Sequence, residues 1–323
     1  MILRGFSGWP AGEQHVALGV FDGVHLGHRS LIADLVAGAR GAGAGTVAAT
    51  FDPLPEVAFG GSLAGSTLST IDERSSLLRE AGVGEVAVFL FDAAFAEQTA
   101  PEFLEQLASA CDIRVIVVGH DFRFGRGRDG DVALLAKHGQ QRGFSVRTVE
   151  PVRLDGEVVS STRVRGALRA GDLRAAEALL ARRYAVSGTV ERGEQRGRTL
   201  GYPTVNVATP VEKLLPSDGI YACWVDERGA RHQAATSLGT RPTFGGGPRA
   251  LECHLLDFSG DLYGQRVTVT FVQRLRDEQR FSDAESLVRQ IAIDVEDTRA
   301  ALGSGEGGLG PTEPQGPRDP SQP

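Results

Sequence analysis

The pattern of apolar residues changes near residue 160, and this change limits the possible folds more than any other feature of the chain. Before it, short apolar runs alternate with amphipathic stretches of helical length. Strands and helices in this order form right-handed crossovers, which predicts a doubly wound parallel α/β sheet with ligands at the carboxyl ends of its strands. The expected strands are 16–20, 46–51, 86–91, 114–118 and 145–149, and the expected helices are 29–40, 71–81, 101–111 and 132–142.

Residues beyond 160 follow a second pattern. The segment 161–184 is typical of two short helices separated by Gly171, with Asp172 as the N-cap of the second. Short β-type runs and turns then alternate, and a final helix is expected over 283–302. This spacing predicts a small antiparallel β-barrel with a C-terminal helix. Its expected strands are 185–192, 219–226, 233–238, 251–258 and 266–272.

The length of 323 residues suits two domains. We predict a sheet domain over 1–160, a helical connection over 161–184 that completes the first site, a barrel domain over 185–302 and a disordered tail over 303–323. The tail contains five of the 15 prolines and hardly any apolar residues, so burial cannot offset the entropy lost on ordering it.

Charge and cysteine content exclude several classes of function. Lys and Arg total 34 against 41 Asp and Glu, and this net charge of −7 argues against partners such as nucleic acid or a membrane surface. Cys111, Cys223 and Cys253 are widely spaced, which indicates neither a disulfide framework nor a zinc site. Since the N-terminus lacks an apolar signal core and no apolar run approaches the roughly 18 residues of a membrane span, we expect a cytoplasmic protein. The sequence is compatible with a homo-oligomer.

The run HVALGVFDGVHLGHR, residues 15–29, ends a strand with polar chemistry that a buried strand does not need. Backbone N–H groups and the positive end of the next helix would meet there, which favours an anion. His25 and His28 can both donate to one phosphate chain, and Gly27 leaves room for it. Surface histidines are the plainer interpretation, but the complete G-x-F-D-G-x-H-x-G-H string favours a ligand. The residues expected at this site are Gly19, Phe21, Asp22, Gly23, His25, Gly27 and His28.

The string SSTRVR, residues 160–165, could add to the same site. Ser161 and Thr162 offer hydroxyl donors at a helix start, and Arg163 and Arg165 offer permanent cations to a triphosphate. An ordinary capped helix explains this string equally well when it is taken alone.

A third string, GHDFRFG, combines an acid with two aromatic residues. Phe122 and Phe124 could be core residues, or with Asp121 they could clasp an aromatic ring system near the edge of the sheet.

The barrel half carries the string GRTLGYPTVNV, residues 197–207. Gly197 and Gly201 let the backbone approach a ligand closely. Thr204 and Asn206 present two oxygens on one side of an extended segment, which can hold Mg²⁺ while nucleotide phosphates and water complete its octahedron.

Further along, Glu252 begins an apolar strand and shares one face with His254 by alternation. Taken alone, a solvent-facing glutamate is the plainer interpretation of Glu252.

Together these strings resemble those of the bacterial bifunctional riboflavin kinase/FAD synthetase family. LGVFDGVHLGHRSLI is similar to the family's version of the HxGH motif of adenylyl-transferring nucleotidyltransferases, VVGHDFRFGRGRDGD to its G-x-[DN]-F-x-F-G segment, and SSTRVR to its ISSTxxR motif. PTVN resembles the PTxN motif of riboflavin kinases. The resemblance extends over about residues 14 to 302.

The resemblance implies two reactions with ATP as co-substrate. The C-terminal domain would phosphorylate riboflavin to FMN with Mg²⁺ on Thr204 and Asn206 and with Glu252 as base. The N-terminal domain would adenylylate FMN to FAD and release pyrophosphate. The residues that the resemblance places on the phosphates there are His25, His28, Ser161, Thr162 and Arg165, and its flavin contacts are Asp121, Phe122, Phe124, Arg276 and Phe281.

Two positions depart from the family pattern. Leu54 replaces the histidine of T-F-x-P-H-P, and loss of one preorganised donor costs on the order of 3 kcal/mol, or about a hundredfold in rate. Adenylyl transfer is therefore expected to be weakened. The alternative is a riboflavin kinase only, whose N-terminal domain serves as a scaffold or regulatory module. The other departure is Ala181, which replaces a usual glycine and should change little chemistry.

Overall fold

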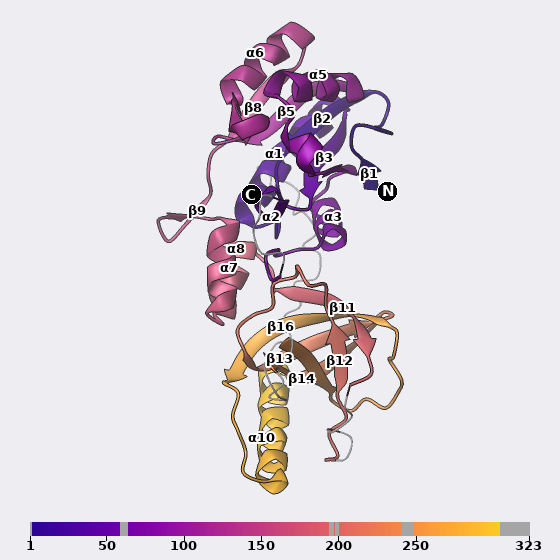
Figure 1. The fold of residues 1–323 in the computed structure, drawn as a ribbon, viewed down its shortest axis with the longest axis vertical. Coiled ribbons are helices and arrows are strands. Elements are labelled where there is room, and N and C mark those ends of the chain that lie inside the picture. The colour runs from indigo at the N-terminus through magenta and orange to yellow at the C-terminus, as the bar shows by residue number, and fades with distance from the viewer. Residues whose placement is uncertain (1, 59–63, 194–196, 198–199, 241–248, 304–323) are drawn as a thin grey trace, which may run out of the picture.

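The structure, a computed structural model, describes residues 2–58, 64–193, 197, 200–240 and 249–303. In Figure 1 a sheet with helices on both faces lies above a barrel. The predicted tail lies outside the described residues, apart from Gly303. In the part of the chain that the structure describes, none of the helices combines the length and the apolar character needed to cross a bilayer.

The upper sheet has six parallel strands in the order β1-β4-β3-β2-β5-β8. They are β1 (Ile2–Arg4), β2 (Glu13–Leu18), β3 (Gly45–Asp52), β4 (Glu85–Leu90), β5 (Asp112–Gly119) and β8 (Ser145–Val149). The expected parallel sheet is confirmed. Sequence patterning missed β1, because three residues at a sheet edge are too few to show a period.

Helices cover both faces of this sheet, as its alternating strand residues require. Ala17 and Val117 pack with α1 and α3 in one apolar cluster, whereas Val16 and Val118 pack with α5 and α6 in another. The helices of this half are α1 (Leu26–Ala42), α2 (Pro55–Ala58), α3 (Ile71–Glu80), α4 (Ala93–Ala96), α5 (Ala100–Ala110) and α6 (Val132–Arg142). Small elements between β5 and α6 are β6 (Arg123–Phe124), the 3₁₀ turn η1 (Arg126–Arg128) and β7 (Gly130–Asp131).

The lower half is a closed antiparallel barrel in the order β11-β12-β15-β14-β13-β16, as predicted. Its strands are β11 (Ala185–Glu191), β12 (Val205–Ala208), β13 (Gly219–Glu227), β14 (Ala230–Thr240), β15 (Arg249–Leu255) and β16 (Arg266–Arg276). The expected C-terminal helix is α10 (Ala284–Gly303), which contacts β13, β14 and β16. Patterning missed β12, whose first three residues lie inside the PTVNV string.

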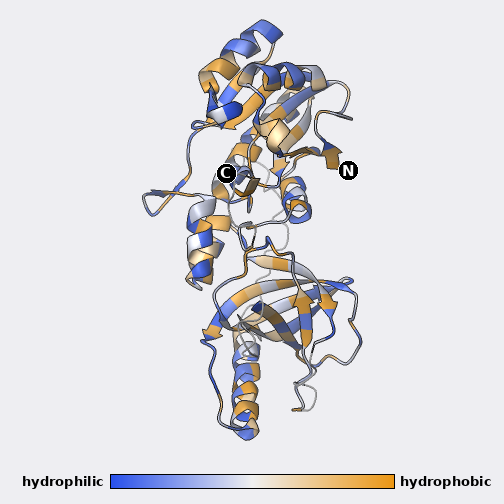
Figure 2. Ribbon diagram, in the orientation of Figure 1, coloured by the Kyte–Doolittle hydropathy of each residue, from blue (hydrophilic) through white to orange (hydrophobic). Residues whose placement is uncertain are grey.

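Two helices join the halves: α7 (Ser161–Arg169) and α8 (Leu173–Leu180), preceded by the hairpin β9 (Arg153–Leu154) and β10 (Glu157–Val158). Asp172 caps α8 as predicted, accepting the N–H of Ala175. Apolar residues of both helices belong to the same buried cluster as the barrel interior, and Figure 2 shows the mixed polarity of their surfaces. The connection is therefore packed on the barrel.

Helix α8 ends at Ala181 in the left-handed region, with φ 53° and ψ 31°. That conformation costs a residue with a Cβ more than it costs glycine. We predict that Ala181→Gly raises the free energy of unfolding by about 0.5 to 1 kcal/mol in urea denaturation. Ala170, the C-cap of α7, is the matched control because its φ of −80° suits a residue with a Cβ. Ala170→Gly should therefore lower the free energy of unfolding. A loss of stability in both variants would contradict the prediction.

Candidate active sites

The chain between β2 and α1 forms a strained turn, residues 19–28, which we call the histidine turn. Phe21 and Val24 are buried and have φ values of 52° and 40°, a region that only glycine adopts without cost. Gly23, with φ 77°, lies between them, and His25 caps α1. The sequence thus places a helix N-terminus at the carboxyl edge of the sheet, where backbone N–H groups can bind phosphate.

The two imidazoles of this turn stack, with ring centroids 3.6 Å apart and planes 17° apart. The backbone N–H of His28 donates to Nδ1 of His25 at 3.4 Å, so the proton of a neutral His25 ring is on Nε2. Burial lowers the pKa of His25 to about 4, although Asp22 opposes the shift. Burial also holds the pKa of His28 well below its usual value, and His25 adds to that shift. Both rings are therefore neutral donors at pH 7.

Two glycines make room for aromatic rings in this turn. A Cβ at Gly19 would lie 2.9 Å from the Phe21 ring, and one at Gly27 would lie 3.1 Å from the His25 ring. Gly27 was expected to make room for phosphate; in the structure the group beside it is the imidazole.

Asp22 has no exposed surface, and its carboxylate faces protein groups instead of a ligand. It accepts the N–H groups of Leu68 and Ser69, each at 3.0 Å, and the hydroxyl of Ser69 at 3.2 Å. Arg165 donates to it at 2.7 Å. Asp22 was expected among the phosphate contacts, but its saturated carboxylate instead fixes the segments around the histidine turn.

The start of α7 is brought to the histidine turn. The Ser161 hydroxyl donates to the Asp22 carbonyl at 2.9 Å, and Arg165 also donates to the Ser66 carbonyl at 2.9 Å. Thr162 is exposed in the first turn of α7. Arg163 is directed elsewhere, because it donates to three carbonyls of the β9–β10 hairpin and pairs with the Glu157 carboxylate. Its expected role on the triphosphate is therefore taken over by a structural one.

Two further arginines surround the turn, although no motif contained them. Arg182 donates to the Gly23 carbonyl at 2.8 Å, and burial lowers its pKa to about 10. Arg74 is fully buried and donates to the Phe51 carbonyl and the Thr50 hydroxyl. Both come from distant segments, so only their tertiary placement reveals them. Leu54, which stands where the family pattern has a histidine, is also buried, with 2% of its surface exposed.

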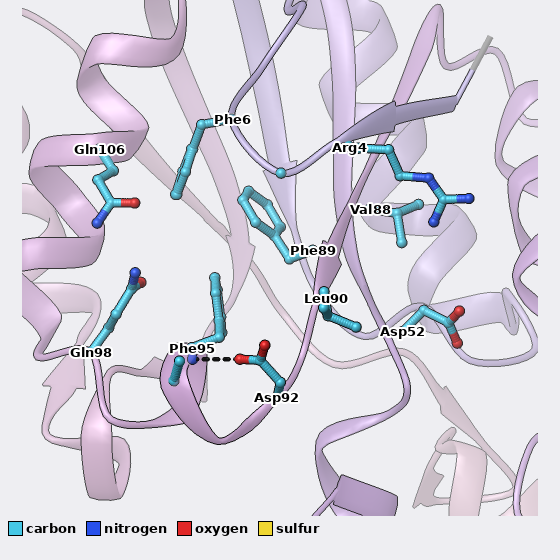
Figure 3. A pocket seen from close by; sticks show the side chains of 12 residues that line it. Arg4, Phe6, Asp52, Val88, Phe89, Leu90, Asp92, Phe95, Gln98 and Gln106 are labelled. Carbon is cyan, nitrogen blue, oxygen red and sulfur yellow. Dashed lines mark hydrogen bonds between the residues drawn. The ribbon is translucent and has the colours of Figure 1, made fainter.

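A cavity of about 390 Å³ opens at the ends of β1 and β4, as Figure 3 shows. Phe6, Phe89 and Phe95 line it with the amides of Gln98 and Gln106. The predicted flavin residues Asp121, Phe122 and Phe124 do not line it. Phe124 is connected to it through aromatic contacts, since Phe103 lies 6.1 Å from Phe95 and 5.7 Å from Phe124 between ring centroids.

Of the three predicted residues, Phe124 is buried, as the core interpretation allowed. Phe122 is half-buried and stacks on it with the planes 19° apart. Asp121 is 83% exposed.

The second predicted site lies on the outside of the barrel. Asn206 of β12 pairs with Glu252 of β15, and Val207, next to Asn206, points into the buried core. Strand alternation therefore puts the Asn206 and Glu252 side chains together on the outer face. Ser237 of β14 pairs with Glu252 from the other side.

The PTVN segment is fixed from both sides. His254 contacts the Pro203 carbonyl through Nδ1 at 2.8 Å, and the Tyr202 ring packs on its imidazole. The backbone of Gly193 lies so close to the Asn206 amide that no Cβ would fit. Gly197 accepts the N–H of Tyr202 at 2.8 Å, and Gly201 has φ 85°. The glycines therefore shape the backbone around Thr204.

The other two expected flavin contacts, Arg276 and Phe281, lie near α10. Arg276 forms a two-point ion pair with Asp294 of α10, both contacts at 2.7 Å, so its guanidinium fixes the helix to the barrel. Phe281 is half-buried in the segment before α10. Among the residues with described positions, no group of three or more His, Cys, Asp or Glu side chains could hold a metal ion.

The buried His25 predicts a pH dependence of stability. The folded state keeps it neutral down to about pH 4, whereas the unfolded chain takes up a proton near pH 6.5. The unfolded state therefore binds more protons between these values, and the free energy of unfolding falls as the pH is lowered from 6.5 to 4, by about 3 kcal/mol from this group. His25→Gln should show a shallower fall in denaturant titrations over this range. Equal slopes in the two proteins would contradict the prediction.

The comparisons with known proteins match both halves of the chain. The FAD synthetase family profile matches residues 10–163, and the riboflavin kinase profile matches residues 180–302. A bifunctional riboflavin kinase/FMN adenylyltransferase from Escherichia coli (strain K12) is 38% identical over 89% of this chain and 92% of its own. One from Pseudomonas fluorescens is 39% identical over 88% and 91%.

A solved structure shows the same architecture over nearly the whole chain. The crystal structure of a protein described as a macrolide-efflux protein from Streptococcus pneumoniae has a TM-score of 0.83 and 32% identity, covering 92% of this chain and 98% of that one. With both family domains present in order and relatives matched along almost their full length, the chain belongs to the bifunctional riboflavin kinase/FMN adenylyltransferase family.

Proposed function

We infer that this chain synthesises flavin nucleotides in two steps. The barrel transfers the γ-phosphate of ATP to riboflavin, and the sheet domain joins the resulting FMN to AMP from a second ATP, with release of pyrophosphate. The observation that carries this inference is the presence of both family domains in one chain. It favours the two-step enzyme over a kinase with a scaffold domain.

We propose that the histidine turn stabilises the triphosphate during adenylyl transfer. An FMN phosphate oxygen attacks the α-phosphorus, the bond to the β-phosphate breaks, and pyrophosphate leaves with the electron pair. Neutral His25 donates through Nε2, and His28, Thr162 and the N–H groups of the turn provide further donors. Fixed donors in a buried site need no rearrangement as charge develops, which suits this reaction. Leu54 cannot contribute one.

Phosphoryl transfer is assigned to the outer face of the barrel. Glu252 accepts the proton of the attacking riboflavin hydroxyl, which then bonds to the γ-phosphorus while ADP leaves. The Thr204 hydroxyl and the Asn206 amide oxygen are hard ligands next to this carboxylate, a donor set that fits Mg²⁺. When bound, Mg²⁺ would neutralise charge on the nucleotide phosphates.

We propose that the flavin ring of FMN lies along the aromatic cluster between Phe95 and Phe122. The cavity in Figure 3 offers rings on which a flat ligand can stack, and amides that can bond to its polar edge. Asp121, next to Phe122 in the chain, has an exposed carboxylate.

Two variants with opposite effects test this assignment. With riboflavin, ATP and Mg²⁺, Glu252→Gln should reduce FMN formation by at least a hundredfold, because the proton acceptor is lost. With supplied FMN, the same variant should form FAD at the wild-type rate. His25→Gln should show the reverse, with FAD formation reduced about a hundredfold by the loss of a preorganised donor.

Chromatography of riboflavin, FMN and FAD from one reaction measures both steps. If wild type converts riboflavin to FMN and never forms FAD from FMN, the kinase-only alternative is correct. If each variant impairs both steps equally, the sites are not separate.

A further inference from the structure

The segment 65–70 lies between the two halves of the molecule and is bonded to both. On the barrel side it pairs with residues 211–214, which follow β12. The N–H of Gly65 donates to the Val211 carbonyl at 2.9 Å, the N–H of Thr67 donates to Glu212 at 2.8 Å, and Thr67 accepts from Leu214 at 2.8 Å. The loop that follows β12 thus holds the segment through an isolated parallel bridge between Thr67 and Lys213.

The other side of the same segment supports the histidine turn. The N–H groups of Leu68 and Ser69 bind the buried carboxylate of Asp22, and the Ser69 hydroxyl accepts the N–H of Gly23 at 2.9 Å. Three layers result: the histidine turn, the segment 65–70, and the segment 211–214. A displacement of the middle layer moves the groups that fix the turn.

Lys213 provides the charged contact between these layers. Its ammonium donates to the Leu68 carbonyl at 2.7 Å and to the Glu73 carboxylate at 2.6 Å, and it lies 4.6 Å from the centre of the Tyr184 ring. Lys213 is 4% exposed, so removal of its partners would leave a buried charge. Glu73 also accepts the N–H of Ser187 in β11 and caps α3.

One peptide group connects Lys213 with Asp22. The carbonyl of Leu68 accepts from Lys213, and the N–H of Ser69 in the same peptide plane donates to Asp22 at 3.0 Å. This plane is rigid, and an ammonium on its oxygen strengthens the hydrogen bond that its N–H makes. The barrel is thereby coupled to the phosphate site through two hydrogen bonds.

We propose that Lys213, a barrel residue, is a positioning residue for adenylyl transfer: it holds the segment 65–70 where that segment fixes the histidine turn. This inference rests on the proposed assignment of adenylyl transfer to that turn. The adenylyltransferase site is accordingly complete only with the kinase domain docked on it.

The test is Lys213→Met, which keeps the length of the side chain and removes its charge. We expect kcat for FAD formation from FMN to fall at least tenfold per folded molecule, while kinase turnover stays within twofold. Amide hydrogen exchange at Ser69 and Gly23 should become faster. A residue that only adds stability would lower the melting temperature and leave kcat of the folded fraction unchanged.

Arg266→Ala is the matched control, because Arg266 of the barrel also pairs with α3, through Asp72 at 3.7 Å. Both side chains of that pair are more than 60% exposed, so the ion pair adds little to stability. The rates of FMN formation and of FAD formation should therefore stay at wild-type values in this variant.

Two results would overturn the proposal. One is FAD formation within twofold of wild type in folded Lys213→Met. The second result concerns the case in which Lys213→Met also loses kinase activity. The double variant Lys213→Met/Glu73→Gln then removes both charges of the buried pair, so that no unpaired charge remains. A wild-type rate of FAD formation in this double variant would refute the role of Lys213. A wild-type protein that forms no FAD would instead refute the proposed function.

Discussion

A carboxylate without contact to solvent determines how this molecule is assembled. Burial of Asp22 is unfavourable by several kcal/mol unless hydrogen bonds and a cation compensate it, so the groups that satisfy it must come together when the chain folds. They come from the segment 65–70, from Arg165 in α7 and, at 3.9 Å, from Arg74 in α3. Two distant parts of the sequence, residues 65–74 and the start of α7, are thereby fixed around the histidine turn.

The two proposed phosphate sites differ in the physical environment of their donor groups. In the sheet domain, burial keeps His25 and His28 neutral and their rings are stacked, so the proposed site offers directed neutral donors. On the barrel, Asn206 and Glu252 lie half-buried on an outer strand face, where a metal ion and water can enter. In the part of the barrel that the structure describes, the interior is filled by an apolar core that fixes these strands.

Hydrophobic period and short motifs predicted the sheet and the barrel, and the motifs marked the residues of two proposed sites, because strands, helices and glycine-rich turns are local properties of the sequence. Short elements such as β1 and β12 escaped, since three or four residues show no period. Motifs also could not say which partner a charge would find. Arg163 and Arg276 were expected on ligands and bind protein groups in the structure. Arg182 and Lys213 lie in no motif, yet Arg182 contacts the histidine turn and Lys213 contacts the segment 65–70.

The central claim is that one chain binds the phosphates of ATP at two separate places. A crystal of the full chain grown with Mg²⁺ and a non-hydrolysable ATP analogue tests it most directly. The account predicts two nucleotides per chain, one with its phosphates at His25 and His28, and one with its phosphates at Thr204 and Asn206. A single nucleotide per chain, with the other of these two places filled only by solvent, would contradict it.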